Sequence, residues 1–158
     1  MRISKTDVEY LLTTSPVARL ATINIDGSPH QVPIVFTWHG GCFWSPIDGK
    51  PKQQVQLRRV KNVMANPCGS LLVDEYHEDW TQLWWIRADL EITVLQLEDT
   101  NPKVREIVML AKTKLEKKYA QYDRTVVLRD PATILLMRPT GFTSWRAGNF
   151  SISQRELF

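Results

Sequence analysis

Residues 83–96 carry the longest regular alternation of apolar and polar side chains in the sequence. The apolar side chains stand at every second position: Trp84, Ile86, Ala88, Leu90, Ile92 and Val94. Successive side chains of a strand point to opposite faces, so this period of two predicts a long β-strand. One face of the strand is expected to be buried, and the other is polar.

Several shorter segments also have strand character. They are residues 17–25, 30–38, 42–46, 70–75, 132–138 and 141–145. Asp26-Gly27 predicts a hairpin turn after the first of them, because both residues tolerate positive φ. Pro33 cannot donate to a ladder, so its strand is expected to have an edge or a bulge there. Most of these strands are sequential neighbours, which favours a mainly β fold, a closed or nearly closed antiparallel barrel.

Three helices are expected between or before these strands. Ser4 can cap a helix over residues 5–14, and residues 53–65 change to helical spacing. Asn101-Pro102 has the order typical of a helix start. The basic stretch 112–118 lies on this last helix, and we expect it to be a solvated helix face.

Composition restricts the class of protein further. With 158 residues, 43% of them hydrophobic, the chain is long enough for one domain with a core and is not disordered. It has no apolar run near the roughly 20 residues of a membrane span and no signal segment, so a cytoplasmic protein is expected. Cys42 and Cys68 make neither a disulfide framework nor a zinc site, and we expect both to be small core residues. His77-Glu78-Asp79 is expected to be a solvated loop rather than a metal site.

A basic cluster stands at the expected connection from a strand to the second helix. It contains five cations and no acid within 12 residues: Lys50, Lys52, Arg58, Arg59 and Lys61. The positive end of a helix and its free N–H groups favour anions, so the cluster is a candidate anion site. An ordinary solvated turn is an equally good interpretation. Nucleic acid would also suit such charges, but aromatic stacking residues typical of such proteins are not recognisable.

The tryptophans and the reactive residues are less informative. Trp84 is expected in the core, whereas Trp85 on the polar face can cover either a planar ligand or a partner subunit. The three histidines are scattered and no nucleophile motif is present, so no catalytic acid, base or nucleophile is assigned.

A succession of short motifs resembles the pyridoxamine 5′-phosphate oxidase-like, FMN-binding split-barrel family. The matching motifs, in order, are Ala18-Arg19-Leu20-Ala21-Thr22, Asp26-Gly27, Pro29-His30, Val32-Pro33, Asp48-Gly49-Lys50-Pro51-Lys52, Leu57-Arg58-Arg59, Asn66-Pro67 and Ser70-Leu71-Leu72-Val73-Asp74. Residues 79–88 are similar to a subgroup described as deazaflavin-dependent. The resemblance covers roughly residues 4–146, and the order of the motifs makes it specific.

The resemblance implies a homodimeric, six-stranded antiparallel split barrel with flanking helices over residues 1–147, followed by a tail at 148–158. Two cofactors, FMN or coenzyme F-420, would lie at the dimer interface. Lys50 and Lys52, with Arg58 and Arg59, match the family's phosphate-binding positions, and Trp145-Arg146 matches a pair that closes the site from the second subunit. The implied cofactor-binding set is Val32, Pro33, Ile34, Ser45, Pro46, Ile47, Lys50, Lys52, Gln53, Arg58, Trp85, Trp145 and Arg146.

The implied activity is a flavin- or deazaflavin-dependent oxidoreductase that moves hydride to or from a small organic substrate. Binding to nucleic acid or membranes is not expected from the resemblance. The chain lacks the C-terminal arginine set of the true oxidases, so pyridoxamine 5′-phosphate oxidase activity is the second choice. A flavin-binding storage or sensor protein without turnover and a small nucleic-acid-binding barrel are the alternatives from other classes.

Overall fold

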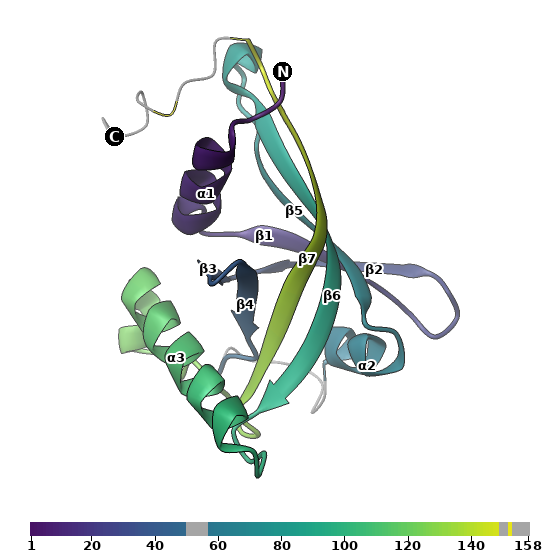
Figure 1. The fold of residues 1–158 in the computed structure, drawn as a ribbon, viewed down its shortest axis with the longest axis vertical. Helices are drawn as coiled ribbons and strands as arrows, with labels where there is room; N and C mark the ends of the chain where they lie inside the picture. The colour runs from purple at the N-terminus through teal and green to yellow at the C-terminus, as the bar shows by residue number, and fades with distance from the viewer. Residues whose placement is uncertain (50–56, 149–151, 153–158) are drawn as a thin grey trace.

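The computed structural model describes residues 1–49, 57–148 and 152. Its α-helices are α1 (Lys5–Thr14), α2 (Arg58–Ala65) and α3 (Pro102–Lys118). Its strands are β1 (Ala18–Ile23), β2 (Pro29–Ile34), β3 (Thr37–His39), β4 (Cys42–Pro46), β5 (Cys68–Glu75), β6 (Trp84–Gln96) and β7 (Thr133–Arg146). Two short 3-10 helices, η1 (Trp80–Gln82) and η2 (Ala120–Asp123), complete the described elements. α1 and α3 lie on one side of the view in Figure 1, and α2 lies on the other.

The strands form one antiparallel sheet with the order β2-β1-β5-β6-β7-β4-β3. Long β6 pairs with β7 along its whole length, from Trp84 opposite Arg146 to Gln96 opposite Thr133. β4 pairs with β7 only over residues 134–137. β6 and β7 therefore form the longest strand pair of the sheet. The described chain has a mainly β, split-barrel fold with three α-helices, as the sequence predicts.

The segment 30–38 is two strands and not one. The chain bends at Val35 and Phe36, where the Tyr119 hydroxyl accepts from Phe36 N (3.0 Å) and donates toward Phe36 O (2.6 Å). These contacts occupy backbone groups that a continuous strand would use in the ladder. The sheet therefore has seven strands, where the family resemblance implied six.

The sequence predicted two strands at residues 132–138 and 141–145, but the structure has one, β7, which begins at Thr133 and runs through both segments. Along β7, Leu90 pairs with Pro139 and Asp89 pairs with Gly141, so Thr140 is an extra residue between the two pairs. The Thr140 hydroxyl donates to Asp89 O at 3.2 Å. A β-bulge of this kind absorbs one residue while the strand continues.

The hairpin turn between β1 and β2 is wider than expected. Gly27 has a φ of 82°, and no other residue type in the described chain has positive φ. Asn24 O accepts from Gly27 N and Asn24 N donates to Ser28 O, both at 2.9 Å. The turn thus spans residues 24–28, and only Gly27, which carries no Cβ, takes the left-handed conformation.

Two apolar clusters hold the helices to the sheet. The larger one buries Leu11 and Leu12 of α1 and Val60 and Val63 of α2 against one face of the strands. The smaller one packs α3 against other residues of β4, β6 and β7. Trp84 is 1% exposed and lies in the larger cluster, which confirms its predicted place in the core.

The cysteine prediction was wrong for one residue. Cys68 is exposed, because it pairs with Glu91 on the solvent-facing side of the sheet, while Cys42 is half-buried beside the smaller cluster. Residues 77–79 are exposed, as a solvated loop requires. No helix in the described ranges is both long and apolar enough to cross a membrane.

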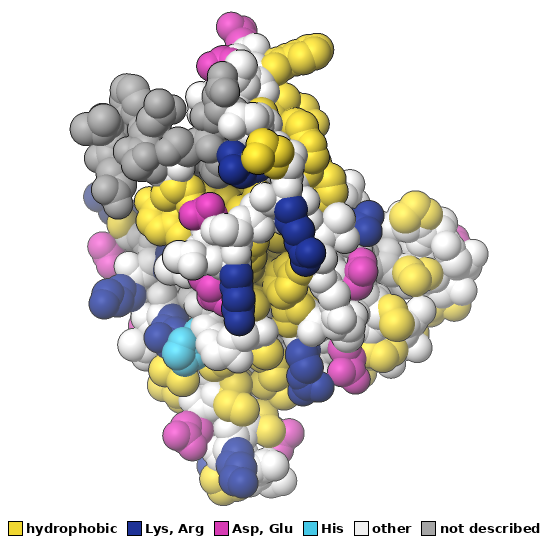
Figure 2. Space-filling view, turned by 45° about the horizontal axis from the view of Figure 1, so that its top comes forward, with side chains coloured by type: hydrophobic (Ala, Val, Ile, Leu, Met, Phe, Trp, Pro, Cys, Tyr) yellow, Lys and Arg dark blue, Asp and Glu magenta, His cyan; other side chains and the backbone are white. Residues whose placement is uncertain are grey.

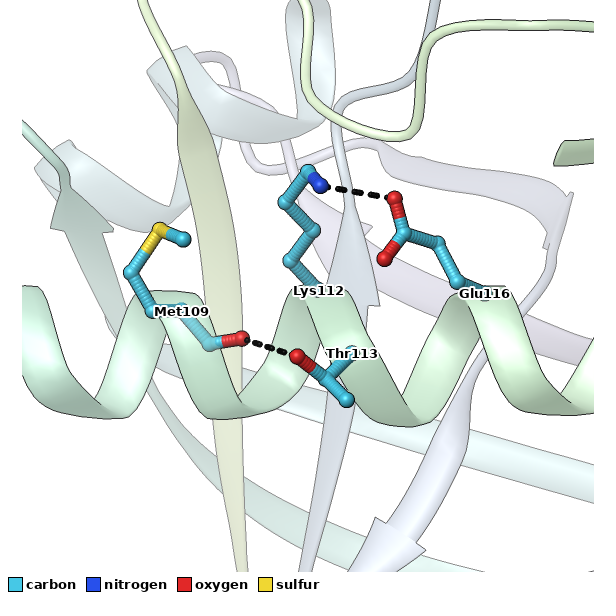
Figure 3. A network of polar contacts seen from close by, with 4 residues as sticks. All are labelled: Met109, Lys112, Thr113 and Glu116. Carbon is cyan, nitrogen blue, oxygen red and sulfur yellow. Dashed lines mark hydrogen bonds and ion pairs between the residues drawn. The ribbon is translucent and has the colours of Figure 1, made fainter. Parts of the chain in front are cut away.

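Most of the basic stretch on α3 is a solvated helix face, as predicted. The Lys112 ammonium donates to Glu116 Oε1 at 2.7 Å, and the Thr113 hydroxyl donates to Met109 O at 3.1 Å (Figure 3). Lys118 differs, since its Nζ is buried 4.3 Å from the centroid of the Phe36 ring. Within the described residues this ammonium has no hydrogen-bond acceptor.

Candidate functional site

The turn that follows β4 is fixed at its start by backbone hydrogen bonds. Ile47 N donates to Thr133 O (3.0 Å), and Ile47 O accepts from Arg129 N (2.7 Å). Gly49 N then donates to Val126 O at 2.8 Å. A Cβ on Gly49 would stand 3.2 Å from that same carbonyl oxygen, so the close approach favours glycine. The chain is therefore held by backbone hydrogen bonds up to Gly49, where the basic turn begins.

The central residues of that turn lie outside the described part of the chain. They are residues 50–56, which include Lys50, Lys52 and Gln53. The first residues of the expected second helix, 53–56, therefore also lie outside the described ranges. The contact of Lys50, Lys52 and Gln53 with a cofactor phosphate stays a prediction. The helix begins at Arg58, because Leu57 is its extended N-cap residue, so the prediction of a helix over residues 53–65 was wrong for residue 57. The helix ends at Ala65, as predicted.

The start of α2 presents two arginines in different environments. Arg58 is exposed, whereas Arg59 is half-buried and its buried Nε has no hydrogen-bond acceptor among the described residues. Burial lowers the pKa of Arg59, and the nearby Asp48 carboxylate opposes that shift. Leu57, the N-cap residue, makes no side-chain hydrogen bond to this helix, and the first turn from Arg58 contains no acid, so the positive helix end favours an anion.

Asp48 is the buried acid beside this group. The Tyr122 hydroxyl donates to Asp48 Oδ2 at 3.4 Å. Burial, together with the charge of Asp48, raises the pKa of Tyr122, so the hydroxyl keeps its proton. Asp48 thus has both a neutral donor and an arginine near it at the point where the basic turn begins.

His30 is a residue near this site that the sequence did not indicate. Burial lowers the pKa of His30, and the positive charges of Arg58 and Arg59 lower it further. The histidine therefore lies within the electrostatic reach of both arginines. Its position on β2 was predictable from the sequence, but the placement of α2 beside it required the tertiary structure.

The segments expected to contact the cofactor ring are mostly buried. Ile34 packs into the larger core cluster, while Val32 is half-buried against it. Ser45, Pro46 and Ile47 are buried, and the Ser45 hydroxyl donates to Val35 O at 2.8 Å. Pro33 is exposed on the other face of β2. Ring contact by these residues stays a prediction.

A row of candidate residues crosses the outer face of the sheet. Pro33 pairs with Arg19, whose guanidinium forms an ion pair with Asp74. Asp74 pairs with Trp85, and Trp85 pairs with Trp145 on β7. Trp85 is half-buried and Trp145 is 38% exposed. The fold therefore brings three of the expected cofactor-binding residues onto one face.

Trp145 and Arg146 do not point to a common site within one chain. Arg146 pairs with buried Trp84, whereas Trp145 pairs with Trp85 on the outer face. Neighbouring residues of a strand face opposite ways, so the two side chains diverge. The backbone of Arg146 exchanges two hydrogen bonds with Met1, each of 2.8 Å.

Among the described residues, no group of three or more histidine, cysteine and acidic side chains is arranged to hold a metal ion. His77 lies in the exposed loop after β5, and its Nε2 atom is 2.6 Å from Oε1 of Glu75, the last residue of β5. This pair is separate from the arginines of α2.

No family model and no curated protein matches the sequence. Solved structures do match. An FAD-binding protein from Mesorhizobium loti is 18% identical with a TM-score of 0.66, and the match covers 91% of this chain and 93% of that one. The heme storage protein HutZ from Vibrio cholerae is 13% identical with a TM-score of 0.65, over 94% and 99% of the two chains. An F-420 reductase is 21% identical with a TM-score of 0.59, over 85% and 94%.

These likenesses, all at low sequence identity, show the fold. The chain has the architecture of the pyridoxamine 5′-phosphate oxidase-like split barrels, which confirms the fold expected from its motifs. The same architecture occurs in proteins described as flavin-binding and in proteins described as heme-binding.

Proposed function

We propose that the chain is a flavin- or deazaflavin-dependent oxidoreductase that binds FMN or coenzyme F-420. The observation that carries the proposal is the pair of cations Arg58 and Arg59 at the start of α2, whose first turn contains no acid. A buried arginine nitrogen without an acceptor among the described residues fits an anionic group such as the cofactor phosphate. Two structural neighbours named for such cofactors, the FAD-binding protein and the F-420 reductase, support the same class.

The residues have distinct parts in this proposal. Arg58 and Arg59, with Lys50 and Lys52 of the preceding turn, would hold the phosphate, while Trp85 and Trp145 would cover the planar ring. The bound cofactor would supply the hydride chemistry, and the chain supplies binding, orientation and exclusion of water. The substrate would be a small organic molecule that stacks against the ring.

A homodimer is part of the proposal. Trp85 and Trp145 belong to neither core cluster, and each is partly open to solvent. Exposed Ile23 and Ile25 add apolar surface at the β1–β2 hairpin, where Figure 2 shows hydrophobic side chains at the surface. Burial against a second copy removes such area from water, at roughly 25 cal/mol per Å².

The first experiment is a titration of the purified protein with FMN, followed by ligand fluorescence and the visible spectrum. Lys52→Ala should raise the dissociation constant about tenfold to a hundredfold, because the lysine supplies a charged hydrogen bond of about 1.5–3 kcal/mol. The double substitution Lys50→Ala with Lys52→Ala should raise the constant further. Lys103→Ala, which removes an exposed charge at the start of α3, is the control. An unchanged constant for the double variant would exclude the turn as the phosphate site.

The second experiment tests the dimer by light scattering. Trp145→Ala should shift the protein toward monomer, since truncation of an aromatic residue at the centre of an interface can cost about 2 kcal/mol or more. Met109→Ala is the control, because it shortens a comparably exposed apolar side chain on α3. A monomeric wild-type protein with bound cofactor would contradict the proposal.

Heme binding is the second candidate function. It is favoured by the exposed His77 ring, which Glu75 holds at 2.6 Å in the way that carboxylates orient metal-ligating histidines. The HutZ structure carries the name of a heme storage protein and has the same fold. A heme absorption band that disappears in His77→Ala, with no flavin binding, would decide for this candidate.

A further inference from the structure

A buried amide ties α2 to the hairpin of β1 and β2. Asn62 is 3% exposed, and its Nδ2 donates to Thr22 Oγ1 and to Asn24 Oδ1, each at 3.0 Å. The NH₂ group of asparagine has two hydrogens, and both are used here. Thr22 is buried as well, and its Oγ1 lies 3.5 Å from the Nδ1 atom of His30. One side chain of α2 thus bonds to β1 and to the turn that follows it, and Thr22 in turn contacts His30 on β2.

Apolar packing alone already attaches α2 to the barrel. Val60 and Val63 lie in the larger core cluster, on the buried side of the same helix. Burial of an amide adds a desolvation cost that a third apolar residue would avoid. Hydrogen bonds are directional, however, so the amide restricts how far α2 can rotate or slide on the hairpin.

The position of the amide connects it to the candidate site. Asn62 follows Arg58 by four residues and Arg59 by three, and residues at these spacings are neighbours on a helix surface. A rotation or a shift of α2 would therefore move both guanidinium groups relative to His30 on the hairpin. Without Asn62, the valines would still bury the helix but would define its orientation less strictly.

We propose that Asn62 is a positioning residue, which sets the placement of Arg58 and Arg59 against the β1–β2 hairpin and thereby the affinity of this site for an anion. The identity of that anion as a cofactor phosphate rests on the proposed function. The effect on the arginines does not, because His30 reports it independently. Burial and the two arginine charges together lower the pKa of His30, so displacement of α2 should let that pKa rise.

The experiment compares Asn62→Ala with Val63→Ala. Both substitutions shorten a buried side chain of α2, but only the first removes the hydrogen bonds to the hairpin. Asn24→Ala, which removes one acceptor at a half-buried position, is a milder version in case Asn62→Ala does not fold. Thr22→Ser keeps the hydroxyl acceptor and serves as the conservative variant.

Three quantities are measured for each variant: the FMN dissociation constant, the pKa of His30 by NMR, and the free energy of unfolding in urea. Asn62→Ala should weaken FMN binding about tenfold, the size of one displaced charged hydrogen bond, and should raise the pKa of His30. Val63→Ala should lower the free energy of unfolding but leave the binding constant and the pKa close to wild type. Thr22→Ser should behave like wild type in binding.

The two proposals fail in different ways. If wild-type protein does not bind FMN, the proposed function is wrong, and the pKa of His30 with inorganic phosphate as the titrant still tests Asn62. An unchanged His30 pKa in folded Asn62→Ala, or in Asn24→Ala if the first variant does not fold, would overturn the positioning role. Equal shifts in Asn62→Ala and Val63→Ala would overturn it as well, since they would indicate general loosening of the helix.

Discussion

The hydroxyl of Tyr119 connects three segments that are far apart in the sequence. It accepts a hydrogen bond from Phe36 N (3.0 Å), donates its one proton to Phe36 O (2.6 Å) and lies 2.9 Å from Pro16 O. Tyr119 itself follows the last residue of α3 and is buried. Tyr119→Phe removes only this oxygen and keeps the ring, so the substitution isolates the contribution of the hydroxyl.

The expected cost can be worked out from these contacts. The substitution loses the hydrogen bonds and leaves the buried Phe36 N–H without this acceptor, which costs about 1–3 kcal/mol. Tyr119→Phe should therefore lower the free energy of unfolding by about 2–3 kcal/mol. With a urea m-value of about 1–3 kcal/mol per M, the midpoint of unfolding should fall by roughly 1 M. The amide of Phe36 should also exchange its hydrogen faster.

The pH dependence of the free energy of unfolding provides a second test of the Tyr119 hydroxyl. Burial raises the pKa of Tyr119 to about 12, against an opposing hydrogen bond from Phe36. In the unfolded chain this hydroxyl ionises near pH 10, so its stabilising effect is present below pH 10 and is lost as the pH rises toward 12. Tyr119→Phe should lose part of this alkaline dependence.

Tyr76→Phe is the matched control, because that hydroxyl belongs to an exposed tyrosine. It should change the free energy of unfolding by less than about 0.5 kcal/mol. The reasoning is refuted if Tyr119→Phe is also within that range at an unchanged m-value. A loss confined to the m-value would likewise contradict it, since that indicates a change in the denatured state.

Two further predictions concern stability. Burial lowers the pKa of Lys118 to about 8, so folding is penalised below pH 8 and the penalty is released as the pH rises toward 10.5. Lys118→Met should therefore stabilise the protein at pH 7 by about 1–2 kcal/mol after allowance for solvent screening, and urea unfolding at pH 10 should show a smaller gain. Gly69→Ala should destabilise by about 1–3 kcal/mol, because its Cβ would stand 2.6 Å from Ile92 Cδ1 and 3.0 Å from Ala21 O. Gly141→Ala, whose Cβ would meet nothing closer than 3.6 Å, should leave the thermal midpoint almost unchanged.

Local patterns in the sequence determined several elements of the fold. The alternation over residues 83–96 corresponds to β6, and its apolar side is the buried side. Ser4 accepts from Asp7 N at 3.1 Å at the start of α1, and Asn101 accepts from Lys103 N at 3.0 Å at the start of α3. Periodicity and capping depend on residues close together in the chain, so they can be read without knowledge of the fold.

The candidate site was only partly predictable, because some of its residues are close together in the chain and others are not. The cations of the turn and of α2 are adjacent in the sequence, and their composition alone indicated an anion site. The sequence did not reveal that His30 lies near them or that Asn62 binds the hairpin, since α2 reaches the hairpin only through tertiary packing. Trp145 and Arg146 are likewise neighbours in the chain, but their pairing with β6 sends them to opposite faces.

The tertiary structure decided where strands end and which residues meet. Tyr119 interrupts the strand expected over residues 30–38 from a position 83 residues away from Phe36. Cys68 is exposed because its pairing with Glu91 places it on the outer face of the sheet. A local pattern indicates which side chains of an element are buried. Strand register and helix docking determine which residues those side chains contact. Those partners arise from contacts between distant segments, which no local period encodes.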